Sequence, residues 1–324
     1  MITPADTALA PATTALQLAT GEAASRCDAA TTRSIALMVL AVGLYSIMDA
    51  MVKWVGPSYP TLEIVFFRSL FAFIPITYIL WRSGSLASLR TRQPLGHAAR
   101  ALTGLISLSL FFYTYTQMPL ANVIAISFAA PLLVTALSVL VLRERVGWRR
   151  WSAVSIGFVG VIVMVKPDAG LFDRIAILAL TATVFYALVI VFIRKLSRTE
   201  TSLAIVFYYA LTSTIVTGAV MPFVWVMPDL EGWVLLILVG VIGGVAQFAM
   251  TNAFRLADVS IVAPFDYMHI IWAALLGFFI WGEVPGNSIW LGTAIVMASG
   301  IYILFREAHL GLPRGIARRL TGRR

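Results

Sequence analysis

Charged, thiol and imidazole side chains are scarce in this chain of 324 residues. Asp, Glu, Lys and Arg make up 12% of it, whereas they form about a quarter of a soluble domain. The single cysteine, Cys27, excludes an intrachain disulfide framework and a thiolate metal site. The three histidines, His97, His269 and His309, are dispersed along the chain, so we expect no metal site.

Motifs of the common enzyme classes are also missing from the sequence. It has no His-Glu-xx-His metal motif, no Gly-x-Ser-x-Gly elbow and no Walker loop. We therefore expect no catalytic residues and no cofactor. ATP-driven transport would need a separate nucleotide-binding partner.

Hydrophobic residues are abundant instead, at 60% of the chain, with a mean hydropathy of +0.90. From Ser34 onward, apolar runs of about 18–25 residues follow one another, and each is long enough to cross ~30 Å of hydrocarbon as a helix. The runs are continuously apolar and do not alternate, which favours helices over strands. The composition predicts an all-α polytopic membrane protein.

Ten transmembrane helices are expected from these runs. They are placed at about 34–54, 62–81, 98–117, 120–142, 148–165, 173–194, 202–223, 232–254, 257–281 and 288–305.

The basic residues test this topology. The net charge is +9, and most of the 24 Lys and Arg fall in alternate loops, Arg100 among them. Only Lys53, Lys166 and Arg174 fall on the other side. Positive loops stay cytoplasmic, so we predict a multi-pass protein of the inner (plasma) membrane with both termini in the cytoplasm.

The two ends of the sequence are predicted to be tails. Residues 1–33 are rich in Ala and Thr and lack the pattern of a secretory signal peptide, and we expect a disordered cytoplasmic tail. Residues 307–324 form a basic cytoplasmic tail that is expected to lie on anionic lipid. Nucleic-acid binding is disfavoured, because no aromatic residues are interleaved with a basic surface.

An internal repeat divides the chain. Leu120-Ala121-Asn122-Val123 recurs as Leu256-Ala257-Asp258-Val259, and Glu144 lies seven residues before Trp151 as Glu283 does before Trp290. The predicted repeats are 34–166 and 173–306, with five spans each. Because five is odd, the second repeat enters the membrane from the opposite face, which is an architecture that many secondary transporters use for alternating access.

These features resemble the EamA-type members of the drug/metabolite transporter superfamily. The resemblance rests on the paired Leu-Ala-Asn/Asp-Val segments, on Arg143-Glu144-Arg145-Val146 and Gly282-Glu283-Val284-Pro285, and on the small-residue helices that follow them. It covers residues 34–306 and identifies the fold better than the substrate. It implies export or import of small organic metabolites such as amino acids, vitamins or nucleotide-like compounds.

Asp266 and His269 are the most informative ionisable residues. Asp266 is expected near the membrane midplane, where a charge is costly and by default indicates function. His269 lies three residues further on, so the two side chains share a helix face and can hydrogen-bond. The pair could bind a proton or a substrate; the alternative is a neutral pair that only ties helices together.

Further residues are candidates for the substrate or proton pathway. Pro264 and Pro131 interrupt corresponding helices of the two halves, which points to a central site. The polar or aromatic residues that complete the candidate pathway are Tyr267, Gln247, Tyr186 and Asn252.

A second cluster of charges is expected near the outer face. Asp49 and Lys53 are spaced for an ion pair within one helix, and Arg68 is expected to pair with Asp49 or Glu63. A packed charge network and an outer gate would have the same pattern. Arg68 could instead hold a substrate carboxylate with its planar fork.

We therefore predict a secondary transporter that moves a small organic metabolite, such as an amino acid or a flat vitamin like riboflavin, by alternating access. Its expected partners are the small-molecule substrate, the lipid bilayer and, as a candidate coupling ion, the proton; nucleic acid is not expected, and the protein is a monomer or homodimer. The alternatives are an intramembrane lipid-modifying enzyme, for which Asp49 and Glu63 are the only candidate acids, and a sensor or scaffold. Neither alternative accounts for the inverted repeat.

Overall fold

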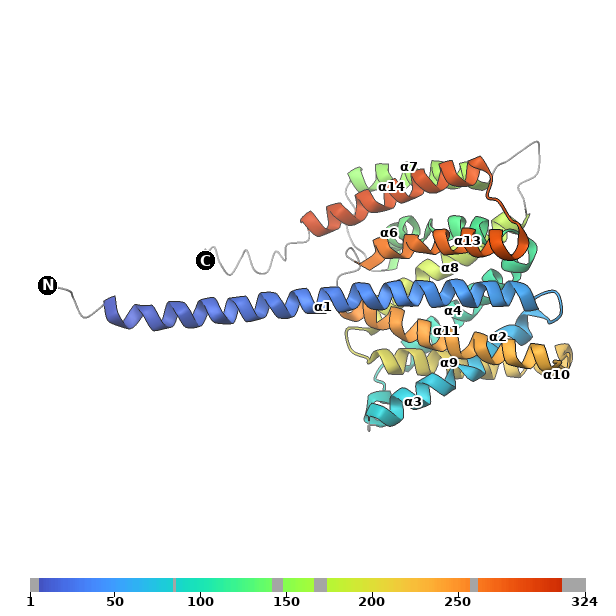
Figure 1. Cartoon of the computed structure of the whole chain (residues 1–324), viewed down its shortest axis with the longest axis horizontal. Helices are drawn as coiled ribbons and strands as arrows, with labels where there is room; N and C mark the ends of the chain where they lie inside the picture. Colours follow the sequence, from blue (N-terminus) through green and yellow to red (C-terminus); the bar gives the residue numbers. More distant parts are fainter. Residues whose placement is uncertain (1–5, 84–85, 142–147, 166–173, 257–261, 311–324) are drawn as a thin grey trace.

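The structure is a computed structural model, and it describes residues 6–83, 86–141, 148–165, 174–256 and 262–310. Every element in these residues is helical (Figure 1). Helices suit an apolar environment, because each backbone N–H and C=O finds its partner within its own segment. The all-α prediction is confirmed for the described part of the chain.

The helices pack as one bundle (Figure 1). The first half contains α1 (Asp6–Val55), α2 (Thr61–Phe71), α3 (Phe73–Ser83), the 3-10 helix η1 (Leu86–Leu89), α4 (Pro94–Gln117), α5 (Leu120–Ser127), α6 (Ala130–Val141) and α7 (Trp148–Val165). The second half contains α8 (Arg174–Leu196), α9 (Ser202–Gly218), α10 (Met221–Val224), α11 (Leu230–Leu256), the 3-10 helix η2 (Ala263–Tyr267), α13 (Met268–Trp281) and α14 (Asn287–Leu310).

Within the described residues, seven helical segments are long and apolar enough to cross a membrane. They are Thr31–Val55, Thr61–Arg82, Pro94–Gln117, Leu120–Leu137, Arg174–Leu196, Leu230–Leu256 and Pro264–Trp281. The apolar helices Trp151–Met164, Ser202–Gly218 and Asn287–Ile303 are shorter. The chain is a multi-pass membrane protein. Residues 257–261, the start of the predicted span 257–281, lie outside the described residues.

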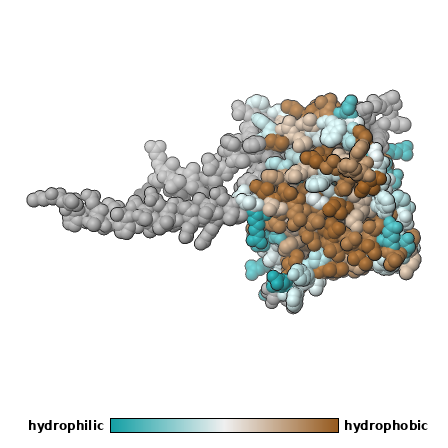
Figure 2. Space-filling view, in the orientation of Figure 1, coloured by the Kyte–Doolittle hydropathy of each residue, from teal (hydrophilic) through white to brown (hydrophobic). Residues whose placement is uncertain are grey.

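The outer surface of the bundle is apolar along its middle. Figure 2 shows a broad hydrophobic band, with hydrophilic residues gathered towards the two ends of the helices. Large side chains such as Phe279 and Ile215 are 77% and 63% exposed. So much exposed apolar surface is unfavourable in water and is expected where lipid surrounds the protein.

Helices of the two halves pack closely against each other. The helix α1 lies along α11, α4 lies along α8, and α7 lies along α14. Glycine permits the closest of these contacts, since a Cβ atom on Gly160 of α7 would stand 2.8 Å from the carbonyl oxygen of Gly292 in α14. Gly240 and Gly244 likewise place α11 against α2 and α3, so this Gly-xxx-Gly pair serves packing within the chain.

Two spans are interrupted near the centre of the fold. The span of α5 and α6 breaks at Phe128 and Ala129, just before Pro131, and the corresponding span of the second half contains the 3-10 helix η2, which includes Pro264. Proline removes a backbone donor and disfavours regular α-helix around it. The predicted interruptions at Pro131 and Pro264 are therefore present, and η2 carries Asp266.

The start of α11 is fixed by a carboxylate in the preceding loop. Asp229 Oδ1 accepts hydrogen bonds from the backbone N–H of Gly232 at 2.8 Å and from the Tyr59 hydroxyl at 2.9 Å. These bonds hold the pKa of the Asp229 carboxyl below its usual range, because they favour the charged form. The contact ties the end of the α1–α2 loop to the second half.

The N-terminal region differs from the prediction. The helix α1 begins at Asp6, whereas residues 1–33 were expected to be a disordered tail. Alanine has the highest helix propensity, and the Ala-rich composition of this segment is compatible with helix. Residues 311–324, most of the predicted basic tail, lie outside the described residues.

The glycine contacts predict a stability difference between two alanine substitutions. Gly240→Ala places a Cβ atom 2.4 Å from Phe71 Cβ and 2.9 Å from the carbonyl oxygen of Phe67, so α11 and α2 must move apart. We expect a loss of about 1–3 kcal/mol. Gly43→Ala in α1 is the matched control, because nothing lies within 4 Å of the new atom.

Thermal unfolding of the purified protein in detergent checks this prediction. The melting temperature should fall for Gly240→Ala and stay level or rise for Gly43→Ala, because alanine favours helix over glycine. Equal melting temperatures for the two variants would contradict the packing of α11 against α2.

Candidate functional site

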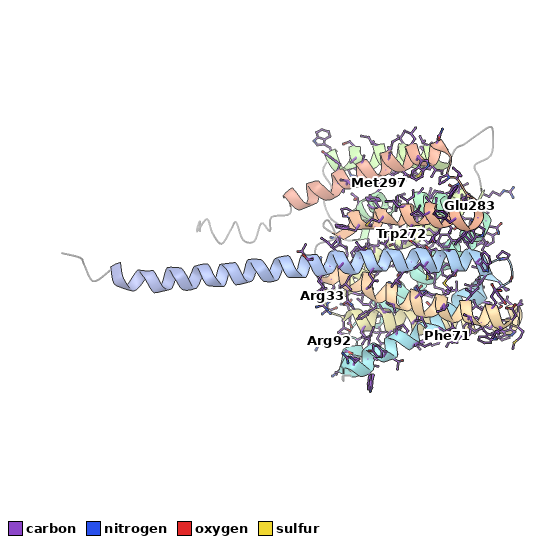
Figure 3. All side chains as sticks on the ribbon, in the orientation of Figure 1. Arg33, Phe71, Arg92, Trp272, Glu283 and Met297 are labelled. Atoms are coloured by element: carbon purple, nitrogen blue, oxygen red, sulfur yellow. The ribbon has the colours of Figure 1, made fainter. Side chains whose placement is uncertain are left out.

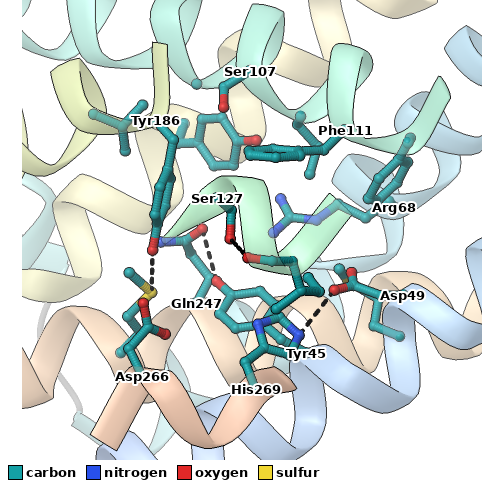
Figure 4. Close-up of a pocket in the computed structure, with 18 of the residues that line it drawn as sticks. Tyr45, Asp49, Arg68, Ser107, Phe111, Ser127, Tyr186, Gln247, Asp266 and His269 are labelled. Carbon is teal, nitrogen blue, oxygen red and sulfur yellow. Dashed lines mark hydrogen bonds and ion pairs between the residues drawn. The ribbon is translucent and has the colours of Figure 1, made fainter. Parts of the chain in front are cut away.

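A cavity of about 110 Å³ lies inside the bundle (Figure 4). Its walls come from α1, α2, α4, α5, α8, α9, α11, η2 and α13. The lining residues are Tyr45, Met48, Asp49, Arg68, Arg100, Gly104, Ser107, Leu108, Phe111, Phe112, Tyr115, Ile124, Ser127, Tyr186, Val189, Ile193, Tyr209, Gln247, Met250, Asp266 and His269. Both halves of the chain therefore build one polar space within an apolar bundle.

The acids and the histidine of the cavity are arranged differently from the prediction. The imidazole Nε2 of His269 lies 3.2 Å from Asp49 Oδ2, which is an ion-pair distance when the histidine is protonated, although the N–H is not aligned for a hydrogen bond. Asp266 lies on the other side of His269, beside Tyr186 (Figure 4). The expected pair of Asp266 with His269 is thus replaced by a contact between α13 and α1.

Local helix geometry brings these residues to the cavity. Tyr45 and Asp49 are four residues apart on α1, so both face the same side. Asp266 belongs to a 3-10 turn, in which residues three apart are eclipsed, and His269 follows in the first turn of α13. Both residues therefore belong to the interrupted part of this span, and both line the cavity.

Two predicted pathway residues take part in polar contacts at the wall. The Tyr45 hydroxyl donates to Gln247 Oε1 at 3.1 Å, which joins α1 to α11. The Tyr186 hydroxyl lies 4.0 Å from the sulfur of Met250, and the ring packs edge-on against Phe111 with centroids 6.3 Å apart. The rings of Tyr45, Tyr186 and Phe111 lie between Asp266 and Arg68 (Figure 4).

Two arginines also line the cavity. Arg68 is 2% exposed and Arg100 is 1% exposed. Their guanidinium carbons lie 5.3 and 4.1 Å from the centre of the Tyr209 ring, a cation–π arrangement. Glycines make room for them: a Cβ atom on Gly104 would be 2.6 Å from Arg100 Nη1, and one on Gly243 would be 3.1 Å from Arg68 Nε.

The sequence analysis counted Arg100 with the basic residues of the cytoplasmic loops, although the expected span 98–117 contains it. The structure places Arg100 within α4 with its side chain buried, so it is not a loop residue. It shares a face with Gly104, Ser107 and Phe111, at the spacing of an α-helix. That spacing to polar and small residues was the signal that could have identified it.

The remaining predicted site residues do not line the cavity. Tyr267 is buried behind the wall, with its ring 4.8 Å from that of Phe128. Pro264, Pro131 and Asn252 are half-buried elsewhere on the same helices. Of the twelve predicted residues, those at the cavity are Asp49, Arg68, Tyr186, Gln247, Asp266 and His269.

The predicted outer charge network is divided among other partners. Lys53 pairs with Glu283 and donates to the carbonyl oxygen of Met118 at 3.0 Å. Glu283 also accepts from the backbone N–H of Leu120 at 3.2 Å. Glu63 accepts from the backbone N–H of Val226 at 3.0 Å. The expected Asp49–Lys53 pair is thus absent from the described contacts, and each partner reaches across the two halves.

No group of three or more His, Cys, Asp or Glu side chains within the described residues could hold a metal ion. The polar and aromatic groups of the cavity are suited to an organic molecule: guanidinium groups, carboxylates, an imidazole, hydroxyls, an amide and aromatic faces.

The family model for the EamA-like transporter family matches residues 32–166 and, a second time, residues 173–306. The chain belongs to this family. The two matches cover most of the sequence and correspond to two repeats, as the resemblance predicted.

Curated relatives are transporters by name. The chain is 29% identical to the S-adenosylmethionine uptake transporter of Rickettsia prowazekii, over 84% of this chain and 92% of the relative. It is 31% identical to the riboflavin transporter of Vibrio cholerae, over 83% and 92%. It is 32% identical to the pseudopaline exporter CntI of Pseudomonas aeruginosa, over 83% and 93%.

A solved crystal structure of a protein 16% identical to this chain has the same fold, with a TM-score of 0.62 over 86% of this chain and 99% of the other. The family and the relatives make this chain a transporter and not an enzyme, as predicted. The lipid-modifying alternative receives no support, and its two candidate acids are separated, because Asp49 faces His269 and Glu63 faces Val226.

The close fit around Arg100 predicts that Gly104→Ala impairs transport more than folding. The new atom meets Arg100 Nη1 and, at 2.9 Å, Tyr209 Cε2, which belong to side chains and not to a helix backbone. We expect transport to fall about tenfold, as for the loss of a hydrogen bond to a charged group, with unfolding free energy changed by about 1 kcal/mol or less.

Counterflow in proteoliposomes with a mixed metabolite pool, read by mass spectrometry, measures the transport, and thermal unfolding measures the stability. Gly43→Ala serves again as the control. Unchanged transport by a folded Gly104→Ala variant would show that the position of Arg100 is unimportant.

Proposed function

We propose that this protein is a secondary carrier that moves a small organic metabolite across the inner membrane by alternating access, with the substrate held in the central cavity. The observation that carries the proposal is the cavity itself: ionisable side chains from both halves face one space inside a bundle with an apolar exterior. Buried charges at membrane depth are costly and are retained where they bind a substrate or an ion.

The repeats 34–166 and 173–306 are proposed to be inverted five-helix units within a ten-span plan. The packing supports this, because the contacts occur in corresponding pairs. When the halves are exchanged, α1 along α11 becomes α8 along α4, and α6 against α8 becomes α13 against α1; α7 along α14 maps onto itself. An approximate twofold relation of this kind gives a carrier two equivalent closed ends.

The orientation is proposed from the charges. Arg33 and Arg92 lie at one end of the bundle, and Glu283 lies towards the other (Figure 3). Because basic loops remain in the cytoplasm, the end with Arg33 and Arg92 is assigned to the cytoplasm, together with the tails 1–33 and 307–324. The end with Glu283 is then the outer face.

The cargoes named for the relatives are S-adenosylmethionine, riboflavin and pseudopaline, and the names include both uptake and export. They share a moderate size and polar groups on an organic frame. We therefore assign to this chain a small organic metabolite of the amino acid or vitamin classes, without a direction of transport.

Asp266 and His269 are proposed as the substrate or proton ligands, with Gln247 and Tyr186 beside them at the wall. Tyr267, Asn252, Pro264 and Pro131 are proposed to act indirectly by shaping the interrupted helices. Asp266 can carry or lose a proton while His269 contacts Asp49, so proton coupling is the proposed source of energy.

Asp266→Asn tests this assignment, because it removes the charge and keeps the shape. We expect counterflow of the selected compound to fall about tenfold or more, and the remaining transport to lose its pH dependence. Glu231→Gln is the control, since Glu231 is an exposed acid outside the cavity. Undiminished transport with an unchanged pH profile would remove Asp266 from the mechanism.

The contacts of Glu283 are proposed to form an outer latch that opens during the transport cycle. Glu283 follows α13 in the second half and binds Lys53 of α1 and the N-terminus of α5 in the first half. Lys53 also lies 5.3 Å from the centre of the Trp281 ring. These contacts hold three helix ends of the two halves together at one end of the bundle.

A single cysteine in the cavity reports on the latch. Ser127→Cys is introduced after the one native cysteine is removed by Cys27→Ser, and its labelling by a membrane-impermeant maleimide is followed from the outer side. Glu283→Ala should raise the labelling rate about tenfold, because it removes two hydrogen bonds to a charged group. Glu231→Gln should leave the rate unchanged, and an equal rate in all three proteins would contradict the latch.

A further inference from the structure

The cavity holds charges of both signs, and its two arginines, Arg68 and Arg100, lack an acidic partner among the described residues. Arg68 Nε, Arg100 Nε and Arg100 Nη1 are buried without a hydrogen-bond acceptor. A guanidinium is always charged in proteins, and a buried donor without an acceptor is costly. An acidic group of a ligand would remove this cost.

The two arginines lie near one aromatic ring. The guanidinium carbons of both lie within 5.3 Å of the centre of the Tyr209 ring, and their side chains come from different helices, α2 and α4. The fork of a guanidinium matches the two oxygens of a carboxylate. Gly104 and Gly243 keep the space beside the guanidinium groups free of Cβ atoms.

The negative charges come from other helices, α1 and η2. Asp49 is engaged by His269, whereas Asp266 lies beside Tyr186 and apart from Arg68 (Figure 4). Asp266 forms no ion pair within the described residues and is only half-buried, so its carboxylate is open to the cavity. Tyr186 and Tyr45 provide aromatic faces near it, and such faces also attract a cation.

We infer that the substrate of the carrier proposed above is a zwitterionic organic molecule of the amino acid type. Its carboxylate is bound by Arg68 and Arg100, and its cationic group is bound by Asp266 beside Tyr186. This occupant alone pairs both sets of charges. A simple acid leaves Asp266 without a partner, a simple cation leaves both arginines without one, and a neutral flat molecule leaves all three.

The first test changes the ligand and uses the native protein. The probes are the common amino acids and S-adenosylmethionine, each compared with a form that lacks the carboxylate charge (a methyl ester, or the decarboxylated compound) and with a form that lacks the amine. Riboflavin is the neutral flat probe. Binding is measured by thermal-shift titration, and transport is measured by counterflow in proteoliposomes.

The result expected is binding and transport of at least one zwitterion, with affinity about tenfold or more lower for each form that lacks one charge. An ester that binds as well as its parent acid would overturn the inference. Transport of riboflavin but of no zwitterion would overturn it too, while leaving the proposed carrier function intact. Transport of no compound by folded protein would instead contradict the carrier function.

The second test assigns the two ends of the ligand. In Arg100→Gln the ratio of the affinity for the zwitterion to the affinity for its ester should fall towards one. The ratio of the affinity for the zwitterion to that for the form without an amine should stay as in the native protein. Asp266→Asn should show the opposite pattern. Arg90→Gln, at an exposed position outside the cavity, is the control and should keep both preferences.

Arg100→Lys covers the case in which Arg100→Gln does not fold. It keeps the charge but loses the planar fork, so it should retain part of the preference for the carboxylate. If both preferences persist in folded Arg100→Gln and Asp266→Asn variants, the inference is wrong.

Discussion

The cost of placing charge inside an apolar bundle determines most of what is specific to this protein. The helices and their outer surface follow from hydrophobicity alone, and any apolar sequence of this length would satisfy them. Arg68, Arg100, Asp49 and Asp266 oppose that trend, because each would be more favourable in water. They line one cavity, where the Tyr209 ring lies against both guanidinium groups and the His269 imidazole lies against Asp49, and these contacts reduce the cost. The cavity is therefore the feature that the rest of the packing has to preserve.

Glycine and interrupted helices preserve it in complementary ways. Gly240 and Gly244 bring α11 against α2 and α3, and Gly160 brings α7 against α14, so the outer helices pack without intervening side chains. At the centre, the 3-10 turn of η2 and the break between α5 and α6 prevent such close packing. A backbone that departs from the α-helix at membrane depth is tolerated where it is buried in protein or faces a cavity. Asp266 lies in such a segment, so the irregular backbone of η2 carries one of the charged side chains that line the cavity.

The sequence predicted the helices well, since long apolar runs are the strongest signal that a membrane protein has. It also found Asp266, His269, Tyr186 and Gln247, because polar residues stand out within such runs. It did not find the partners. Spacing along one helix suggested Asp49 with Lys53 and Asp266 with His269, whereas the structure joins Asp49 to His269 and Lys53 to Glu283 across the halves. Arg100 was missed for a related reason. Near the end of an apolar run, the sequence does not distinguish an arginine in a loop from an arginine whose side chain is buried in the bundle.

The contacts between the two halves that the sequence analysis did not predict include several of one kind, in which a glutamate accepts a hydrogen bond from a backbone N–H. Contacts of this kind suit a protein that must change shape. Glu283, Glu200 and Glu63 each accept a hydrogen bond from a backbone N–H of the other half, donated by Leu120, Arg92 and Val226. Each such bond contributes about 1.5–3 kcal/mol, which is enough to hold helix ends together and small enough to be exchanged. A substrate shifts a conformational equilibrium only by its differential affinity for the two states. Residues of both halves line the cavity, so the affinity for a ligand that contacts both halves would change when the halves move. A change in binding free energy of this kind can offset hydrogen bonds of this strength at the ends of the bundle.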